Sequence, residues 1–221
     1  MQLIPAVIPK TKDHLVSTLE KVQGSASAVQ IDLVDGAFVQ GVSPSWPWAT
    51  RTFVDEMYMV FADLASNFEL EIDLMVDRPE QYIEELVSAS VSRIVVHVGS
   101  TEQLDAILAF RPYVKIGLAF TNDTSIELLK TYHDAIDFVQ CMGIAHIGEQ
   151  HHPFDERVLA RIAEIRTTYP ALEISVDGGV TVATLPRLIA AGATRLVAGS
   201  AIFGNPYPDR AYGELASLLT V

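Results

Sequence analysis

The chain has 221 residues, 49% of them hydrophobic, which is enough for a substantial core. The formal net charge of −13 argues against nucleic acid as a partner, because phosphate backbones are bound by clustered basic side chains. The single cysteine excludes an intrachain disulfide, no basic segment marks a signal peptide and no apolar run nears the ~20 residues that span a bilayer, so we expect a cytoplasmic protein with no membrane partner.

Apolar β-rich runs alternate with stretches of helical period from end to end of the chain. The predicted strands are residues 3–8, 28–34, 71–76, 92–98, 114–120, 135–142, 173–176 and 195–198. The predicted helices are residues 11–22, 51–65, one opened by Arg78-Pro79-Glu80, one from 101 to before Pro112, 124–132, 154–168, one between the last two strands, and 209–219. No linker or change in composition divides them.

Eight strand–helix units in one uninterrupted chain predict an α/β fold, a single (β/α)8 TIM barrel over residues 1–221. Near-continuous apolar strands such as RIVVHV suit a parallel sheet covered by helices. A doubly wound open sheet would normally carry a glycine-rich fingerprint after its first strand, and IPAVIPKT has no glycine. The barrel is therefore favoured.

In a barrel, the carboxyl ends of the strands face the active site. Gln30 and Asp32 are two residues apart on the second strand, so they share a face, and Asp73 and Asp177 come from the third and seventh strands. Three carboxylates in one pocket repel one another unless a cation lies among them or a proton is shared. The cluster therefore predicts either a metal site or paired acid and base carboxylates.

Glycine follows the last two strands, at Gly178 and Gly179 and again at Gly199, which precedes Ser200. Glycine at a strand end lets backbone N–H groups approach a ligand closely, and a nearby helix start adds partial positive charge. These residues predict a phosphate cradle.

Other polar residues at the strand ends have structural explanations. We expect Asp35 to order a turn with the glycine after it, and Asp77 to cap the next helix. Cys141 fits a small apolar lining residue better than a nucleophile, because no basic partner is placed beside it.

Four histidines and two tryptophans receive no assigned role. His97 fits a packed, hydrogen-bonded histidine, and His146, His151 and His152 lie in the long loop of residues 143–153; two adjacent histidines point different ways, so a shared metal is not expected. Trp46 and Trp48 fit either a lid or a contact between copies in a homo-oligomer, and the sequence does not decide between them.

Several segments resemble the ribulose-phosphate 3-epimerase family: QIDLVDGAFV, DLMVDRPEQYI, VDGGV and VAGSAIF. The resemblance extends over nearly the whole chain and implies a sugar-phosphate epimerase in which Asp32 and Asp177 act as acid and base. It also implies phosphate contacts from Gly178, Gly179, Gly199 and Ser200.

In that family two histidines and two aspartates hold a divalent metal. Gln30 and Asp73 stand at the histidine positions here, so the implied ligands are Gln30, Asp32, Asp73 and Asp177. This all-oxygen set suits Mg²⁺ or Mn²⁺ better than zinc or iron; alternatively, the metal has been lost.

Two further departures concern the substrate site. Ala6 replaces a serine of the first strand, and the family's loop after the sixth strand is rebuilt as MGIAHIGEQHHPF, where Gly148 and Gln150 align. The resemblance implies Gly148 as a phosphate contact and Ala6, Met75 and Cys141 as pocket residues.

Three functions compete. The first is an isomerase that epimerises a ketose phosphate, with a small sugar phosphate as its partner. A lyase or synthase of the same barrel superfamily would need a D-x-K pattern, and the chain reads Asp73-Leu74-Met75. The third function, suggested by the missing histidines and the rebuilt loop, is a protein that binds a sugar phosphate without catalysis.

Overall fold

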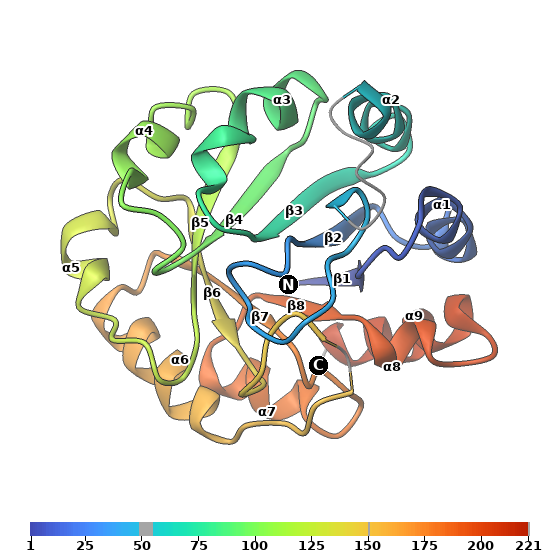
Figure 1. Ribbon diagram of the computed structural model, residues 1–221. Helices are drawn as coiled ribbons and strands as arrows, with labels where there is room; N and C mark the ends of the chain where they lie inside the picture. Colours follow the sequence, from blue (N-terminus) through green and yellow to red (C-terminus); the bar gives the residue numbers. More distant parts are fainter. Residues whose placement is uncertain (49–54, 150, 221) are drawn as a thin grey trace.

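Eight parallel strands close into a barrel with helices around its outside (Figure 1), in a computed structural model that describes residues 1–48, 55–149 and 151–220. Each strand pairs with the next in sequence, and the last pairs with the first. The predicted (β/α)8 barrel is confirmed. The strands are β1 (Gln2–Val7), β2 (Ala28–Val34), β3 (Glu69–Met75), β4 (Arg93–His97), β5 (Lys115–Phe120), β6 (Phe138–Met142), β7 (Glu173–Asp177) and β8 (Arg195–Ala198).

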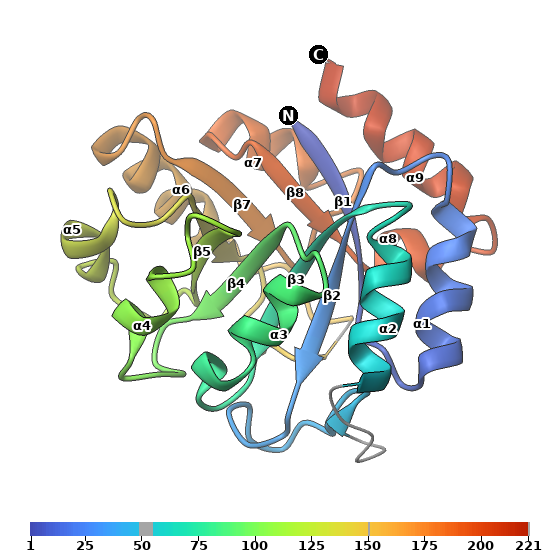
Figure 2. The same ribbon diagram turned by 90° about the horizontal axis from the view of Figure 1, so that it is seen from above.

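The α-helices alternate with the strands and pack on the outer face of the sheet (Figure 2). They are α1 (Lys12–Leu19), α2 (Asp55–Leu64), α3 (Ile83–Ser88), α4 (Leu104–Leu108), α5 (Leu128–Tyr132), α6 (Arg157–Thr168), α7 (Leu185–Ala191), α8 (Ser200–Phe203) and α9 (Pro208–Ser217). Short 3₁₀ turns cover Glu20–Val22, Pro79–Gln81 and Leu218–Thr220. Within the described ranges, no helix is long and apolar enough to cross a membrane.

The side chains of each strand alternate between the helices and the barrel interior, because successive residues of a strand point to opposite faces. On β2, Val29, Ile31 and Leu33 join the large apolar core between sheet and helices. Gln30 and Asp32 are buried among the inward-facing residues instead. Asp32 lies directly opposite Asp73 in the β2–β3 register.

Some predicted boundaries differ from the structure. Strand β3 begins at Glu69, because its backbone N–H pairs with the carbonyl of Ser27. The first part of the helix predicted from residue 51 lies outside the described residues. The predicted capping role of Asp77 is wrong: Arg78 occupies the N-cap of the 3₁₀ turn without a side-chain cap, and the Asp77 carboxylate pairs with the Arg78 guanidinium at 3.2 Å.

The two tryptophans pack within the chain. Trp46 is 1% exposed and meets Phe61 of α2 edge-on, with 6.3 Å between ring centroids. Trp48 is partly buried and meets Tyr82 edge-on at 5.3 Å. The prediction of an oligomer contact through Trp46 is wrong, because its buried ring packs against α2; the lid stays a prediction.

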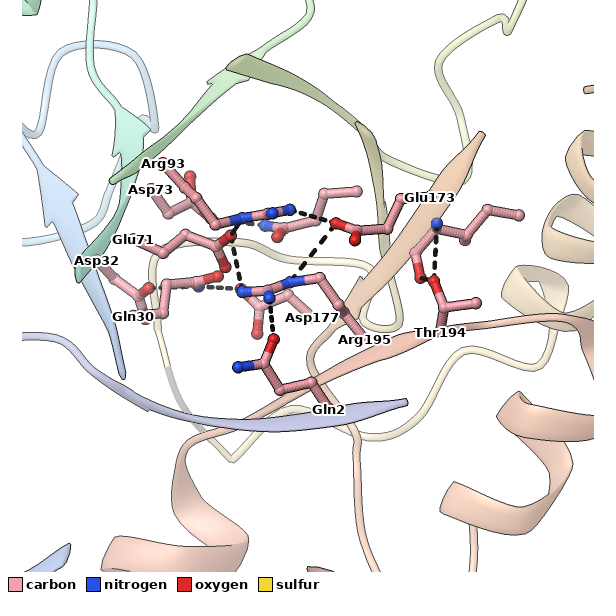
Figure 3. A network of polar contacts seen from close by, with 12 residues as sticks. Gln2, Gln30, Asp32, Glu71, Asp73, Arg93, Glu173, Asp177, Thr194 and Arg195 are labelled. Carbon is pink, nitrogen blue, oxygen red and sulfur yellow. Dashed lines mark hydrogen bonds and ion pairs between the residues drawn. The ribbon is translucent and has the colours of Figure 1, made fainter. Parts of the chain in front are cut away.

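The amino-terminal end of the barrel interior holds an ionic network in which Glu71, Arg93 and Arg195 are buried and Glu173 is partly exposed (Figure 3). Arg93 Nε donates to Glu71 at 2.6 Å, and Arg195 donates to the same carboxylate oxygen at 3.1 Å. Both guanidinium groups also pair with Glu173. Two acidic and two basic groups balance, so this layer carries no net charge.

We predict that Arg93→Met lowers the free energy of unfolding by about 3–5 kcal/mol, because it leaves the Glu71 carboxylate buried without its closest partner. Urea unfolding followed by circular dichroism measures the change. The matched control is Arg187→Met, which removes an exposed ion pair with Glu156 and should cost no more than about 1 kcal/mol. Equal losses in the two variants would contradict a stabilising role for the network.

Candidate active site

Three carboxylates from different strands meet at the carboxyl end of the barrel. Asp32 lies near the carboxyl end of β2, Asp73 lies on β3 and Asp177 is the last residue of β7. One carboxylate oxygen of each lies within 4.8 Å of the other two. The Gln30 amide nitrogen donates to Asp32 at 2.7 Å and to Asp177 at 3.0 Å. One neutral amide therefore bridges two of the three acids (Figure 3).

Two further side chains contact the Asp73 carboxylate. His97 Nε2 lies 2.8 Å from one carboxylate oxygen, and the Gln140 amide nitrogen donates to the other at 2.9 Å. His97 is thus packed and hydrogen-bonded, as expected, but its partner belongs to the acidic cluster. Strand alternation could have indicated that His97 at the end of β4 and Gln140 in the middle of β6 face inward, but not that both meet Asp73.

Burial and mutual repulsion favour the protonated forms of two of these acids. Burial raises the pKa of Asp32 well above its ordinary value, and the neighbouring Asp177 and Asp73 raise it further. Burial, followed by Asp73, raises the pKa of Asp177 to about 7. Burial and repulsion therefore oppose the simultaneous ionisation of both carboxyl groups.

A cavity of about 110 Å³ opens above the cluster and is lined by every residue expected to bind phosphate: Gly148, Gly178, Gly179, Gly199 and Ser200. Asp32 and Asp177 also line it, whereas Asp73 is fully buried beneath. Gly178 and Gly179 have φ values of 91° and 68°, which favour glycine. A Cβ at Gly143 would lie 2.1 Å from the Gly178 carbonyl oxygen, so the ends of β6 and β7 approach closely because Gly143 has no side chain.

Two of the three expected pocket residues lie in this cavity, and one does not. Ala6 and Met75 line it. Cys141 belongs to the apolar core outside the barrel, and burial raises its pKa to about 12. Its assignment to the pocket is wrong, because it lies one residue out of register with the inner face of β6, where Met142 lines the cavity.

The rebuilt loop after β6 contributes polar groups that were given no role. Glu149, His151 and His152 line the cavity, and His152 lies 3.5 Å from the Glu149 carboxylate. His146 is exposed, with its ring 5.5 Å from that of His152. Gln150 lies outside the described residues.

Asp35 joins two loops at the barrel mouth. One carboxylate oxygen accepts from the backbone N–H groups of Ala37 and Phe38, at 2.8 and 3.0 Å, which confirms the expected turn. The other accepts from the backbone N–H of Asp77 in the loop after β3, at 2.7 Å. The ring of Phe38 lies 5.9 Å from that of His97, so the turn reaches the acidic cluster.

The cluster fits a divalent cation. Three carboxylates converge, and the Gln30 side-chain carbonyl oxygen is buried with no hydrogen-bond partner among the described residues. Carboxylate and amide oxygens are the ligands that hard cations prefer. A bound cation would replace the hydrogen bonds that Gln30 now donates, once its amide turns to present the oxygen.

Comparison with known proteins relates the chain to one family. The model of the "Ribulose-phosphate 3 epimerase family" matches residues 2–203. The chain is 26% identical to ribulose-phosphate 3-epimerase of Bacillus subtilis (strain 168), covering 97% of this chain and 98% of that protein. It is also 26% identical to the cytoplasmic isoform of the same enzyme from Oryza sativa subsp. japonica, covering 99% and 92%.

Solved structures share the fold at lower identity. The 3-hexulose-6-phosphate synthase of Salmonella typhimurium superposes with a TM-score of 0.75 at 13% identity, over 100% of this chain and 99% of that one. Orotidine 5'-phosphate decarboxylase of Pyrococcus horikoshii OT3 gives 0.68 at 15%, over 99% of each chain.

The raised pKa of Asp177 predicts a pH-dependent stability of the metal-free protein. The folded state holds the proton up to about pH 7 and the unfolded state releases it near pH 3.8, so this stabilisation is complete below pH 3.8 and is lost as the pH rises through 7. In chelator, Asp177→Asn should flatten the fall in melting temperature between pH 4 and 8. The control, Asp63→Asn at an exposed side chain at the end of α2, should leave it unchanged. Superimposable profiles of Asp177→Asn and the unaltered chain would contradict the shift.

Proposed function

The chain belongs to the ribulose-phosphate 3-epimerase family, and we propose that it epimerises a ketose phosphate by proton transfer between Asp32 and Asp177. This makes it an isomerase of the carbohydrate epimerase class. The placement of the two carboxylates supports the proposal most directly: they line one cavity from β2 and β7 and share a hydrogen-bonding partner, Gln30.

Epimerisation needs a base on one face of the reacting carbon and an acid on the other. With one proton shared, ionised Asp177 removes the proton beside the substrate carbonyl, and the electron pair moves onto the carbonyl oxygen as an enediolate. Protonated Asp32 then returns a proton to the same carbon from the opposite face. Each turnover leaves Asp177 protonated and Asp32 ionised, and proton exchange with solvent restores the starting state. The two roles exchange in the reverse direction.

The substrate's phosphate would bind in the glycine cradle. Gly178 and Gly179 lie at the end of β7, directly after Asp177, so binding the phosphate there fixes the distance from the anchored end to the reacting carbon. Ser200 begins the short helix α8 and contributes a hydroxyl and a backbone N–H. Rigid anchoring of this kind supplies much of the orientation that a proton transfer requires.

Gln30, Asp32, Asp73 and Asp177 would hold a divalent cation, and Mg²⁺ or Mn²⁺ suits these oxygen ligands better than zinc or iron. When bound, such an ion polarises the substrate carbonyl and lowers the cost of the negative charge that forms on it. His97 and Gln140 orient Asp73 through its two oxygens, as outer contacts of a metal ligand commonly do.

Cytoplasmic location is proposed because the one cysteine is a buried thiol and a cytoplasmic isoform of the enzyme from rice aligns along nearly the whole chain. Assembly into a homo-oligomer stays a prediction.

The hydrogen bonds of Gln30 support a second candidate, a binding protein without catalysis. An amide that joins Asp32 to Asp177 satisfies both acids without a cation. Such a protein would bind the sugar phosphate tightly and show no turnover.

Asp32→Asn and Asp177→Asn should each lower proton exchange at C3 of D-ribulose 5-phosphate by about 10²- to 10⁴-fold, the usual contribution of a positioned acid or base. Proton NMR in deuterated buffer with added Mg²⁺ or Mn²⁺ measures the exchange. The control is Ser175→Ala, two residues before Asp177 on the same face of β7, buried and outside the cavity. No exchange by the unaltered chain with either metal, together with tight binding, would instead support the binding protein.

Metal preference gives an independent prediction. Gln30→His introduces an imidazole into the cluster and should raise the ratio of Zn²⁺ to Mn²⁺ affinity at least about tenfold, because imidazole suits zinc better than manganese. Calorimetric titration of the chelator-treated protein measures both affinities. Gln103→His places a histidine on the surface and should leave the ratio unchanged. An unaltered ratio in Gln30→His would show that Gln30 does not contact the ion.

A further inference from the structure

A second, larger cavity of about 730 Å³ adjoins the candidate active site. It lies between α1, the end of α8 and the loops after β1, β2 and β6, on the side of the barrel where α1 and α8 are neighbours (Figure 1). Ile8, Gly148, Glu149 and His151 line both cavities. The two cavities therefore adjoin and share these residues, so a charge bound in one acts electrostatically on the other.

Three basic residues converge on the larger cavity. Lys10 lies in the loop after β1, His14 on α1 and Lys21 in the 3₁₀ turn that continues α1. His14 and Lys21 are seven residues apart, which is close to two helical turns, so they share one face. The backbone N–H of Lys10 donates to His14 Nδ1 at 3.2 Å, which places Lys10 beside His14.

Neither lysine is neutralised within the described part of the chain. Lys12, on the same helix but outside the cavity, pairs with Glu56 at 3.5 Å, whereas no ion pair involves Lys10 or Lys21. Glu149 is the one acidic group among the described residues that line the cavity, and it lies 3.5 Å from His152. Burial, followed by Lys10 and Lys21, lowers the pKa of His14, as expected where positive charge accumulates.

The rest of the wall suits an organic anion. Ser17 and Ser43 offer hydroxyl groups, and Val42, Pro44 and Phe203 offer apolar surface. A phosphate monoester carries about −1.5 to −2 charges at neutral pH, which two lysines balance. Lysine also binds phosphate effectively as a point charge. Because the whole chain carries a formal net charge of −13, a positively charged cavity attracts anions that the chain as a whole repels.

We propose that this cavity is a second anion subsite, in which Lys10 and Lys21 bind a phosphoryl group. The group is either the distal phosphate of a ketose bisphosphate that extends from the active site, or part of a separate phosphorylated molecule bound beside the substrate. In the first case, which rests on the proposed function, the substrate is larger than a pentulose monophosphate. In the second, the subsite binds an effector.

Calorimetry with ribulose 1,5-bisphosphate as the probe tests the subsite. At low ionic strength, Lys10→Gln/Lys21→Gln should raise the Kd for the bisphosphate about tenfold, because two exposed ion pairs are lost, and should leave the Kd for D-ribulose 5-phosphate within about twofold. The matched control is Lys12→Gln, which should change neither. Melting temperatures report whether the variants remain folded.

Inorganic phosphate distinguishes the two sources of the phosphoryl group. If it binds protein saturated with D-ribulose 5-phosphate, and the double variant loses this binding, the subsite takes a separate molecule. If only the bisphosphate depends on the lysines, one ligand spans both cavities. Unchanged affinities for bisphosphate and phosphate in the double variant would overturn the subsite. Failure of the proposed epimerisation is separate, since it would abolish proton exchange and leave lysine-dependent binding intact.

Discussion

The barrel interior carries charge in two layers. The lower layer is the ionic network at the amino-terminal end, and the upper layer is the acidic cluster at the carboxyl end. The charge of the upper layer depends on the lower layer being balanced. Arg93 spans that layer with its guanidinium 4.0 Å above the Phe138 ring, while it donates to Glu71 and Glu173. The ring fits because Gly117 has no side chain: a Cβ there would lie 2.3 Å from it. Because the lower layer has no net charge, only one unbalanced layer, the acids at the mouth, remains for a cation or a shared proton to neutralise.

Most of the site residues that could be predicted from the sequence were predicted from the alternation of side chains along the strands. The period of two placed Gln30 and Asp32 on one face, and the glycines at two strand ends were expected near the site and do line its cavity, because these features depend on local geometry alone. Cys141 shows the limit of this reasoning. A strand end known to within one residue leaves the inward face undecided, so a slip of one position exchanged Cys141 for Met142.

Contacts between distant strands were not predictable from one sequence. His97 and Gln140 reach Asp73 across 24 and 67 residues of chain, and Arg93 reaches Glu173 across 80. His97 lies on β4, which pairs directly with β3, whereas the contacts of Gln140 and Glu173 join strands that are not neighbours and are set by closure of the barrel. Trp46 was misread for a related reason: its burial depends on α2, whose position the loop sequence does not reveal.

The hydrogen bonds of Asp35 have a mechanical consequence for the mouth of the barrel. One carboxylate ties the turn after β2 to the backbone of the loop after β3, so neither segment can swing outward without breaking bonds to the other. Phe38 moves with that turn and rests against His97, the residue that supports Asp73. The loops at the entrance and the acids beneath them are therefore joined by one continuous chain of contacts, from Asp35 through Phe38 and His97 to Asp73.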